Sequence, residues 1–143
     1  MPITQTMCTS FKVALLKGEM NFDVNTTQTF NIALYDRDAN LNENTIAYTT
    51  EDEIPNERGY TTGGMPLVIS TRPTSDKTTA LVSFNDVSWP NATFNVRGAL
   101  IYSVGAGNPA VAVLDFGVDK AAVGTFIITF PMADADNAII RIT

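Results

Sequence analysis

The sequence predicts an all-β domain: a β-sandwich of jelly-roll or immunoglobulin-like type, with one short helix or arm at the N-terminus. Short apolar segments rich in Val, Ile and Phe recur along the chain, and Thr, Asn, Gly and Asp cluster between them, which is typical of strands joined by turns. Several segments also alternate with the two-residue period of a strand. A length of 143 residues suits one hydrophobic core, so we expect residues 1–143 to form a single domain.

The N-terminal segment, residues 1–10, is expected to be an extended arm that could order against a neighbouring subunit. It has no cationic stretch followed by a long apolar run, so it does not read as a secretory signal, and we expect synthesis in a cytoplasm. Thr9–Lys17 is the one helical candidate, because its apolar residues fall on one face and Gly18 can take the left-handed conformation at its end. A strand is the alternative for this segment.

The first clear strand is Thr29–Tyr35, where Phe30, Ile32 and Leu34 lie on one side. It is followed by a polar segment, Asp36–Asn44, which we expect to be a loop.

A second loop is predicted for Thr49–Gly64, which is too charged and too interrupted by Pro and Gly to lie in a core. Met65–Ser70 and Ala80–Phe84 are the next predicted strands. A turn around Pro73–Lys77 would separate them.

The C-terminal half carries the strongest strand signal. Four apolar segments joined by Gly-containing turns are expected to pair as neighbours: Thr93–Val104, Ala110–Phe116, Phe126–Phe130 and Ala138–Ile142. Ala99 and Ile101 make the second face of the first segment apolar, and Ala110–Leu114 has no polar residue at all. Such strands need cover on both faces, whereas a two-sheet sandwich covers only one. We expect a partner subunit or the N-terminal segment to supply the rest.

The charge balance argues against two classes of partner. Nine Lys and Arg residues against fifteen Asp and Glu residues give a net charge of −6, which repels polyphosphate, so we expect no nucleic-acid partner. Anionic lipid is disfavoured for the same reason, and no apolar run approaches the roughly 20 residues that span a bilayer. We therefore expect no membrane partner.

Catalytic and metal-binding motifs are weak throughout. Histidine is absent, which removes the commonest general base and argues against a hydrolytic triad. Cys8 is the only cysteine, so no internal disulfide and no multi-cysteine metal site can form. Only Lys12 lies near enough in sequence to activate the thiol, so we expect Cys8 to be a packed or mobile residue without chemistry.

Oxygen ligands two residues apart resemble the start of a calcium loop. They are Asp36, Asp38, Asn40 and Asn42. The glycine expected at the sixth position is Leu41, and the bidentate glutamate expected at the twelfth is Ala47. We therefore expect a solvated loop, no metal site and no cofactor.

Two pairs of carboxylates could be considered for glycoside hydrolysis, which needs an acid facing a base or nucleophile. They are Asp134 with Asp136, and Asp115 with Asp119. Turn-forming aspartates beside strand ends are the favoured interpretation. We expect no catalytic residue and no enzyme activity.

The glycine-containing segments do not form a phosphate-binding motif. Gly105, Gly107 and Asn108 stand between two predicted strands, which predicts a hairpin turn. The pair Gly63 and Gly64 lacks the Lys and Ser or Thr of a P-loop.

Trp89 is the single tryptophan and lies near Phe94 in the sequence. It could form a sugar-stacking platform, but a lone Trp is more often a core or interface anchor. The platform leads to an alternative function, a receptor- or carbohydrate-binding module, in which Trp89, Tyr60 and the loop Glu51–Tyr60 would form the contact surface.

Six stretches, in this order and spacing, resemble small proteins encoded among the head and tail structural genes of tailed bacteriophages. They are Met7–Lys12, Phe30–Tyr35, Gly59–Gly64, Arg97–Tyr102, Ala110–Gly117 and Phe130–Ile140. The resemblance covers almost the whole chain. It departs at Glu51–Glu53 and Pro55–Arg58, where a loop rich in Ser, Thr and Gly would be expected.

The resemblance implies a β-sandwich virion protein, namely a capsid cement or decoration protein. Under the same resemblance, the alternative receptor- or carbohydrate-binding module would be tail-associated. Such a protein would bind the major capsid protein on the outer capsid surface, would form a homo-oligomer and would need no cofactor. The acidic balance of this chain suits the outer face of a shell, away from packaged DNA.

Overall fold

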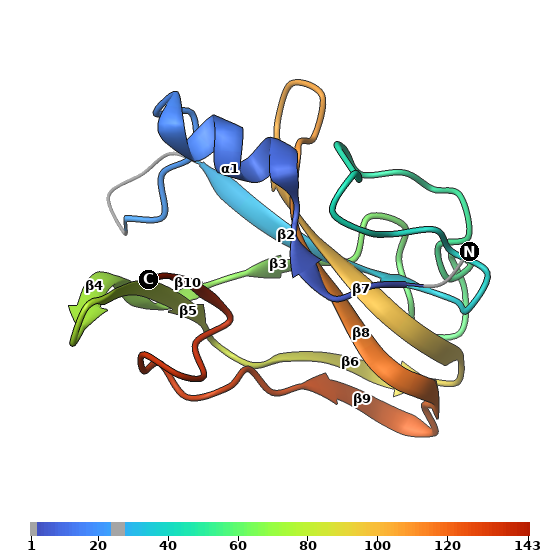
Figure 1. The fold of residues 1–143 in the computed structure, drawn as a ribbon. Coiled ribbons are helices and arrows are strands. Elements are labelled where there is room, and N and C mark those ends of the chain that lie inside the picture. The colour runs from blue at the N-terminus through green and yellow to red at the C-terminus, as the bar shows by residue number, and fades with distance from the viewer. Residues whose placement is uncertain (1–2, 24–27) are drawn as a thin grey trace.

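The computed structural model describes residues 3–23 and 28–143, which form one short helix and ten strands (Figure 1). The elements are, in chain order, β1 (Thr6–Met7), α1 (Thr9–Leu16), β2 (Thr29–Tyr35), β3 (Met65–Leu67), β4 (Ile69–Asp76), β5 (Thr79–Phe84), β6 (Val87–Ala92), β7 (Asn95–Val104), β8 (Ala110–Ala121), β9 (Gly124–Ile128) and β10 (Ile140–Ile142). The predicted all-β, sandwich-like fold with a short N-terminal helix is confirmed.

The strands form three antiparallel sheets. The largest has the order β1-β8-β7-β2-β3, and the two smaller sheets have the orders β10-β5-β4 and β6-β9. Figure 1 shows the two smaller sheets on one side of the large sheet, with α1 across its end. A cluster of aromatic rings joins these parts, because Phe22 stacks on Phe30 of β2 at 4.5 Å between ring centroids and also meets Phe11 of α1 and Phe84 of β5.

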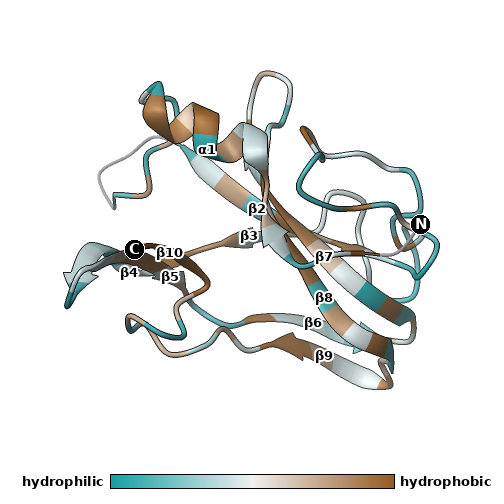
Figure 2. Ribbon diagram, in the orientation of Figure 1, coloured by the Kyte–Doolittle hydropathy of each residue, from teal (hydrophilic) through white to brown (hydrophobic). Residues whose placement is uncertain are grey.

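The centre of the large sheet is buried on both faces within the chain. Leu100 and Ile101 of β7, which point to opposite faces, and Val113 of β8 have no exposed surface. The Ile3 side chain lies against Gly98 of β7, so the N-terminal segment covers part of one face of the sheet, which was one of the two expected alternatives. Figure 2 shows β8 changing from hydrophobic residues near α1 to more polar residues at its far end. The strand is buried at its beginning, Ala110–Leu114, and exposed at its end. The sheet faces therefore do not require a partner subunit.

The N-terminal segment lies on its own chain. Ile3 is 5% exposed and bridges to Leu41, and Thr6 and Met7 pair with β8. Residues 3–10 of the expected arm are therefore docked on this domain, and residues 1–2 lie outside the described residues.

The predicted pairing of the C-terminal strands is wrong in part, and one strand was not predicted. Among the four C-terminal segments only β7 and β8 pair with each other, whereas β9 pairs with β6 and β10 pairs with β5. β6 was not predicted as a strand, because Pro90 and Asn91 interrupt its apolar pattern. Among the described residues β6 is paired only with β9, and its register shifts after Pro90, so the proline lies at an irregular edge position of the kind where proline is tolerated.

The predicted turn at Pro73–Lys77 is also misplaced, since β4 continues through Pro73 to Asp76. β4 is an end strand of its sheet, and its register with β5 shifts between Thr71 and Thr74. Such an irregular edge accommodates a proline without disrupting the sheet.

Candidate functional site

The long connection between β2 and β3 is held to the sheet by a cluster of polar groups around Glu53. The Glu53 carboxylate accepts hydrogen bonds from the Tyr48 hydroxyl at 2.7 Å, from the Tyr60 hydroxyl and from the backbone N–H of Gly63 at 2.8 Å. The Tyr60 hydroxyl in turn accepts the backbone N–H of Leu34 in β2 at 3.1 Å. The cluster therefore ties three points of the connection to one strand.

Two further tyrosines extend this attachment. Tyr48 stacks on Tyr102 of β7 at 4.6 Å between ring centroids, and the Tyr102 hydroxyl donates to the Gly63 carbonyl at 2.7 Å. The Tyr35 hydroxyl donates to the Thr49 carbonyl at 2.6 Å. Burial raises the pKa of all four tyrosines above the ordinary value. Their hydroxyls therefore remain protonated donors at neutral pH, and we assign the cluster a structural role.

The expectation that Thr49–Gly64 lies outside the core is wrong for part of the segment. Ile54 is 4% exposed and Tyr60 is 3% exposed. Gly64 lies so close to β2 that a Cβ there would come within 1.8 Å of the Ile32 carbonyl oxygen. The charge at Glu53 is accommodated because three donors satisfy it, a pairing that charge and proline content do not reveal.

Cys8 is fully buried, and its thiol lies 3.9 Å from the Asn42 carbonyl oxygen. Burial, with a smaller contribution from Glu43, raises the pKa of Cys8 to about 11. The thiol is therefore protonated and shielded at neutral pH, so it is a packed cysteine, which is the first of the two expected alternatives.

The segment resembling a calcium loop is a series of turns. The Asp36 carboxylate accepts the backbone N–H of Asp38 at 2.8 Å, and the Asn42 side chain accepts that of Asn44 at 2.8 Å. Burial raises the pKa of Asp36 above its usual range. Within residues 3–23 and 28–143, no group of three or more Cys, Asp or Glu side chains is arranged to hold a metal ion.

The candidate carboxylates Asp115 and Asp119 are held by cations. Arg97 lies 3.4 Å from Asp115 and 3.8 Å from Asp119, and Arg37 lies 3.5 Å from Asp119. Both carboxylates therefore belong to an ion-pair cluster on β7, β8 and the adjoining loop.

The other candidate pair, Asp134 and Asp136, lies in a turn. The Asp134 carboxylate accepts hydrogen bonds from the Asn137 side chain and from the backbone N–H groups of Asp136 and Asn137. The Asn137 side chain is the main reason why the pKa of Asp134 is lowered. These bonds match the turn-forming role expected from the sequence.

The aromatic surface proposed for carbohydrate or receptor binding does not exist in this form. Trp89 is 1% exposed, and its ring packs against Tyr60 and Phe126. With Tyr60 also buried, neither ring can stack on a ligand. Among the described residues, the Trp89 Nε1 atom is the buried side-chain nitrogen or oxygen left without a hydrogen-bond partner. The alternative interpretation of Trp89 as a core anchor agrees with this burial.

The glycines of the β7–β8 connection form the predicted hairpin turn. The Asn108 N–H donates to the Gly105 carbonyl at 3.0 Å, and the Asn108 side chain accepts the Gly105 N–H at 3.1 Å. These backbone groups are therefore engaged within the turn.

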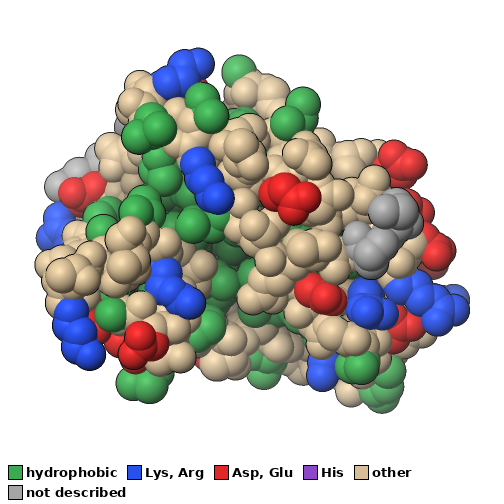
Figure 3. All heavy atoms as spheres, viewed as in Figure 1, with side chains coloured by type: hydrophobic (Ala, Val, Ile, Leu, Met, Phe, Trp, Pro, Cys, Tyr) green, Lys and Arg blue, Asp and Glu red, His purple; other side chains and the backbone are tan. Residues whose placement is uncertain are grey.

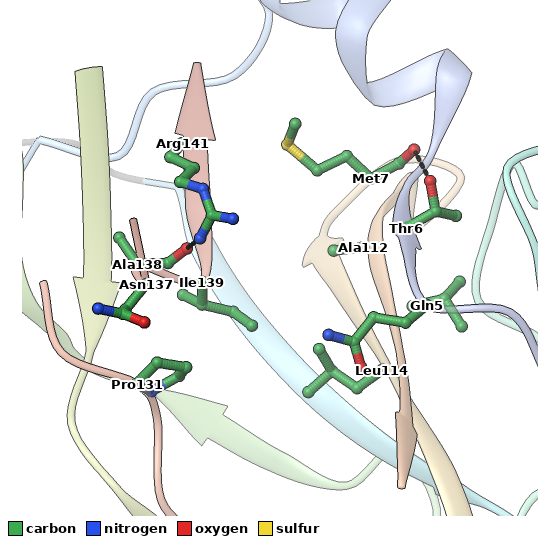
Figure 4. Close-up of a pocket in the computed structure, with 11 residues that line it drawn as sticks. Gln5, Thr6, Met7, Ala112, Leu114, Pro131, Asn137, Ala138, Ile139 and Arg141 are labelled. Atoms are coloured by element: carbon green, nitrogen blue, oxygen red, sulfur yellow. Dashed lines mark hydrogen bonds between the residues drawn. The ribbon is translucent and has the colours of Figure 1, made fainter. Parts of the chain in front are cut away.

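A groove of about 270 Å³ separates the large sheet from the β10-β5-β4 sheet. Figure 4 shows Gln5, Thr6 and Met7 on one wall and Ile139 and Arg141 on the other. Ala112 and Leu114 of β8 contribute apolar surface to its lining. In the space-filling view the hollow below α1 is lined largely by hydrophobic side chains (Figure 3).

Large apolar side chains are exposed at several places, Ile46 and Met132 among them, and two of these places lie at opposite ends of the molecule. Leu16 and Val13 of α1 are 91% and 50% exposed. Val123, between β8 and β9, is 85% exposed, and Ile127 of β9 is 56% exposed. Figure 1 shows α1 and β9 on opposite sides of the domain. These two groups are called the α1 end and the β9 end below.

Comparisons with protein-family models, curated proteins and solved structures found no match for this chain. Among the described residues, no helix is both long and apolar enough to cross a bilayer.

Proposed function

We propose that this chain is a structural protein of a tailed-bacteriophage particle, a capsid cement or decoration protein that binds the outer surface of the shell and stabilises it. Its partners would be the major capsid protein and further copies of itself. The proposal requires no catalytic residue, cofactor, nucleic acid or membrane.

The observation that carries the proposal is the resemblance to small phage structural proteins, together with the place of the resembling stretches in the fold. Phe30–Tyr35, Arg97–Tyr102 and Ala110–Gly117 lie in β2, β7 and β8, the centre of the large sheet. Met7–Lys12 begins at β1 and enters α1, and Gly59–Gly64 contains Tyr60 and the glycine that approaches β2. These five stretches therefore belong to one packed unit, whereas most of the sixth, Phe130–Ile140, is a partly exposed connection.

The two exposed ends support a bridging role. A cement protein contacts neighbouring shell subunits with different parts of one rigid body, so that modest contacts are reinforced by being made together. Leu16 at the α1 end and Val123 at the β9 end expose apolar surface that a protein contact could cover. The net charge of −6 favours a site away from packaged DNA.

Copies of this chain would associate through surfaces other than the apolar strand faces. The apolar faces of β7 and β8 are covered inside the chain, so they offer no surface to a second copy. Contacts between copies would instead use the α1 end or the β9 end.

The test is to mix tagged protein with capsids that lack it and to count bound copies by quantitative gel or by reconstruction of the particle. We expect stoichiometric addition, with hundreds of copies per particle, and a higher temperature of capsid disruption. Val123→Ser and Leu16→Ser should each weaken addition, whereas Thr78→Ser, in the turn between β4 and β5, serves as a matched surface control. Binding only to tails or to host glycans would overturn the proposal.

A further inference from the structure

The groove between the large sheet and the β10-β5-β4 sheet is bounded by two end strands. β1 is the last strand of the large sheet, and β10 is the last strand of the smaller one. Among the described residues, each therefore has a neighbouring strand on one side only. Figure 4 shows the two strands facing each other across the groove.

The backbone of β1 presents hydrogen-bonding groups to this groove. The Cys8 N–H donates to the Val111 carbonyl of β8 at 3.0 Å, and Thr6 and Met7 pair with Val113 and Ala112. Backbone groups alternate in direction along an antiparallel strand, so the N–H and C=O of Met7 point away from β8. The Thr6 hydroxyl donates to the Met7 carbonyl at 3.0 Å, which leaves the Met7 N–H as the donor of this edge.

The side chains of the groove favour a particular kind of segment. Ala112 and Leu114, which are 3% and 7% exposed, contribute apolar lining. The Arg141 guanidinium projects from β10 toward Met7 in Figure 4 and donates to the Ala138 carbonyl at 3.2 Å. Within residues 3–23 and 28–143, Arg141 forms no ion pair with a carboxylate, although its charge helps to lower the pKa of Asp134. The groove thus combines strand edges, apolar lining and an arginine that is not held in an ion pair.

We propose that the groove is a docking site for an extended segment of another polypeptide, which adds as a strand between β1 and β10 and places an acidic side chain beside Arg141. Strand addition satisfies edge N–H and C=O groups in a way that no small molecule or folded surface can match. A segment of about five residues is long enough, since a strand rises about 3.3 Å per residue. The inference goes beyond the proposed function, because it specifies a type of contact and does not depend on the particle.

The inserted strand would join the two sheets. The order β4-β5-β10 on one side and β1-β8-β7-β2-β3 on the other would become continuous through the added strand. Specificity would then come from alternate side chains: those facing inward meet Ala112 and Leu114, and an acidic residue meets Arg141.

The experiment uses the full isotope-labelled chain and three capped synthetic hexapeptides. The first alternates Val and Thr with one Glu, the second has Lys in place of Glu, and the third is the Glu peptide with alternate backbone nitrogens methylated. Backbone amide shifts and hydrogen exchange are followed at Gln5, Met7 and Ile139–Ile142. We expect the Glu peptide to shift and protect these amides, and the methylated peptide to bind at least about tenfold more weakly, because it cannot form the ladder.

Two variants separate the backbone and charge contributions. Arg141→Met should abolish the preference for the Glu peptide over the Lys peptide, whereas Lys120→Met, which removes an exposed cation at the far end of β8, should leave that preference unchanged. Met7→Pro removes the edge donor but no bond to β8, so it should weaken all peptides in a protein that still folds. Equal binding of the methylated peptide, or no shift at these amides up to about 5 mM of any peptide, would overturn the proposal. Either result would leave the capsid-binding assay of the proposed function unaffected.

Discussion

The Glu53 cluster leads to a quantitative prediction about stability. Replacing Glu53 by Ala removes the acceptor of three donors: the hydroxyls of Tyr48 and Tyr60 and the backbone N–H of Gly63. A buried donor left without a partner costs about 1–3 kcal/mol. The Tyr48 side chain is half-buried and its hydroxyl can turn toward water, so the cost of losing its hydrogen bond to Glu53 lies near the lower limit. Removing the carboxylate also recovers part of its desolvation cost, and the sum is about 3–4 kcal/mol.

Glu53→Gln should be much less harmful. The amide oxygen can still accept from Tyr60 and Gly63, which share one carboxylate oxygen, and the amide nitrogen can donate to Tyr48. The loss is then confined to the weaker, uncharged hydrogen bonds, about 1–2 kcal/mol. Glu51→Ala is the matched control in the same loop, because Glu51 is exposed, and it should cost less than about 0.5 kcal/mol.

The assay is equilibrium unfolding in urea at pH 7, with the slope of each transition compared among variants. For a chain of this size, Glu53→Ala should lower Tm by about 10 °C. A free energy of unfolding within about 0.5 kcal/mol of the Glu51→Ala value would refute the assigned role of Glu53. A larger loss for Gln than for Ala would show that the cluster tolerates a cavity better than a neutral amide.

Four further outcomes are expected. The pKa of every tyrosine, Tyr60 included, is raised by burial. Above about pH 10 the tyrosines of the unfolded chain release protons that the folded chain retains, so the free energy of unfolding falls as pH rises. Tyrosinate absorbance that appears before the protein unfolds would contradict this. Gly64→Ala should lower the free energy of unfolding several-fold more than Gly117→Ala, because a Cβ on Gly64 would strike the β2 backbone. Gly117 is the control, since its φ of +81° is close to the +83° of Gly64 and the space around it is open. Equal urea midpoints for the two variants would show that the connection between β2 and β3 can shift. Leu100→Asp places a carboxylate at a fully buried position of β7 and should prevent folding, so a soluble variant with a cooperative melt would mean that the burial is misassigned. Chelation should leave Tm unchanged, because Asp36–Asn44 lacks the glycine and bidentate glutamate of a calcium loop, and calorimetry showing a calcium-dependent rise would contradict this.

The parts of the fold that depend on a few neighbouring residues could be predicted from the sequence. Thr29–Tyr35 alternates cleanly and is β2 with the same bounds, and the segment before Gly18 is the helix. The glycines and Asn108 between β7 and β8 indicated their hairpin. In each case the signal and the structure involve the same few residues.

Pairings between distant segments could not be predicted in this way. β10 joins β5 and β9 joins β6, although the sequence suggests hairpins among the C-terminal strands. The Glu53 cluster is also non-local, because Tyr102 and Leu34 lie far from Glu53 in the sequence. A charged loop with prolines predicts exposure unless the partners of the charge are known. The candidate groove depends on the same information, since β1 and β10 become end strands only through their pairing.

The position of β1 has a consequence for biosynthesis. Thr6 pairs with Val113, more than a hundred residues further along the chain. A ribosome that adds about 5–20 residues per second needs roughly 5–20 s between making the two partners. During that interval the nascent chain carries α1 and β2 without β7 and β8, so Phe11 and Phe30 have no sheet to pack on. Cells that make this protein in large amounts would therefore need chaperone capacity in proportion to the number of translating ribosomes rather than to the amount of finished protein.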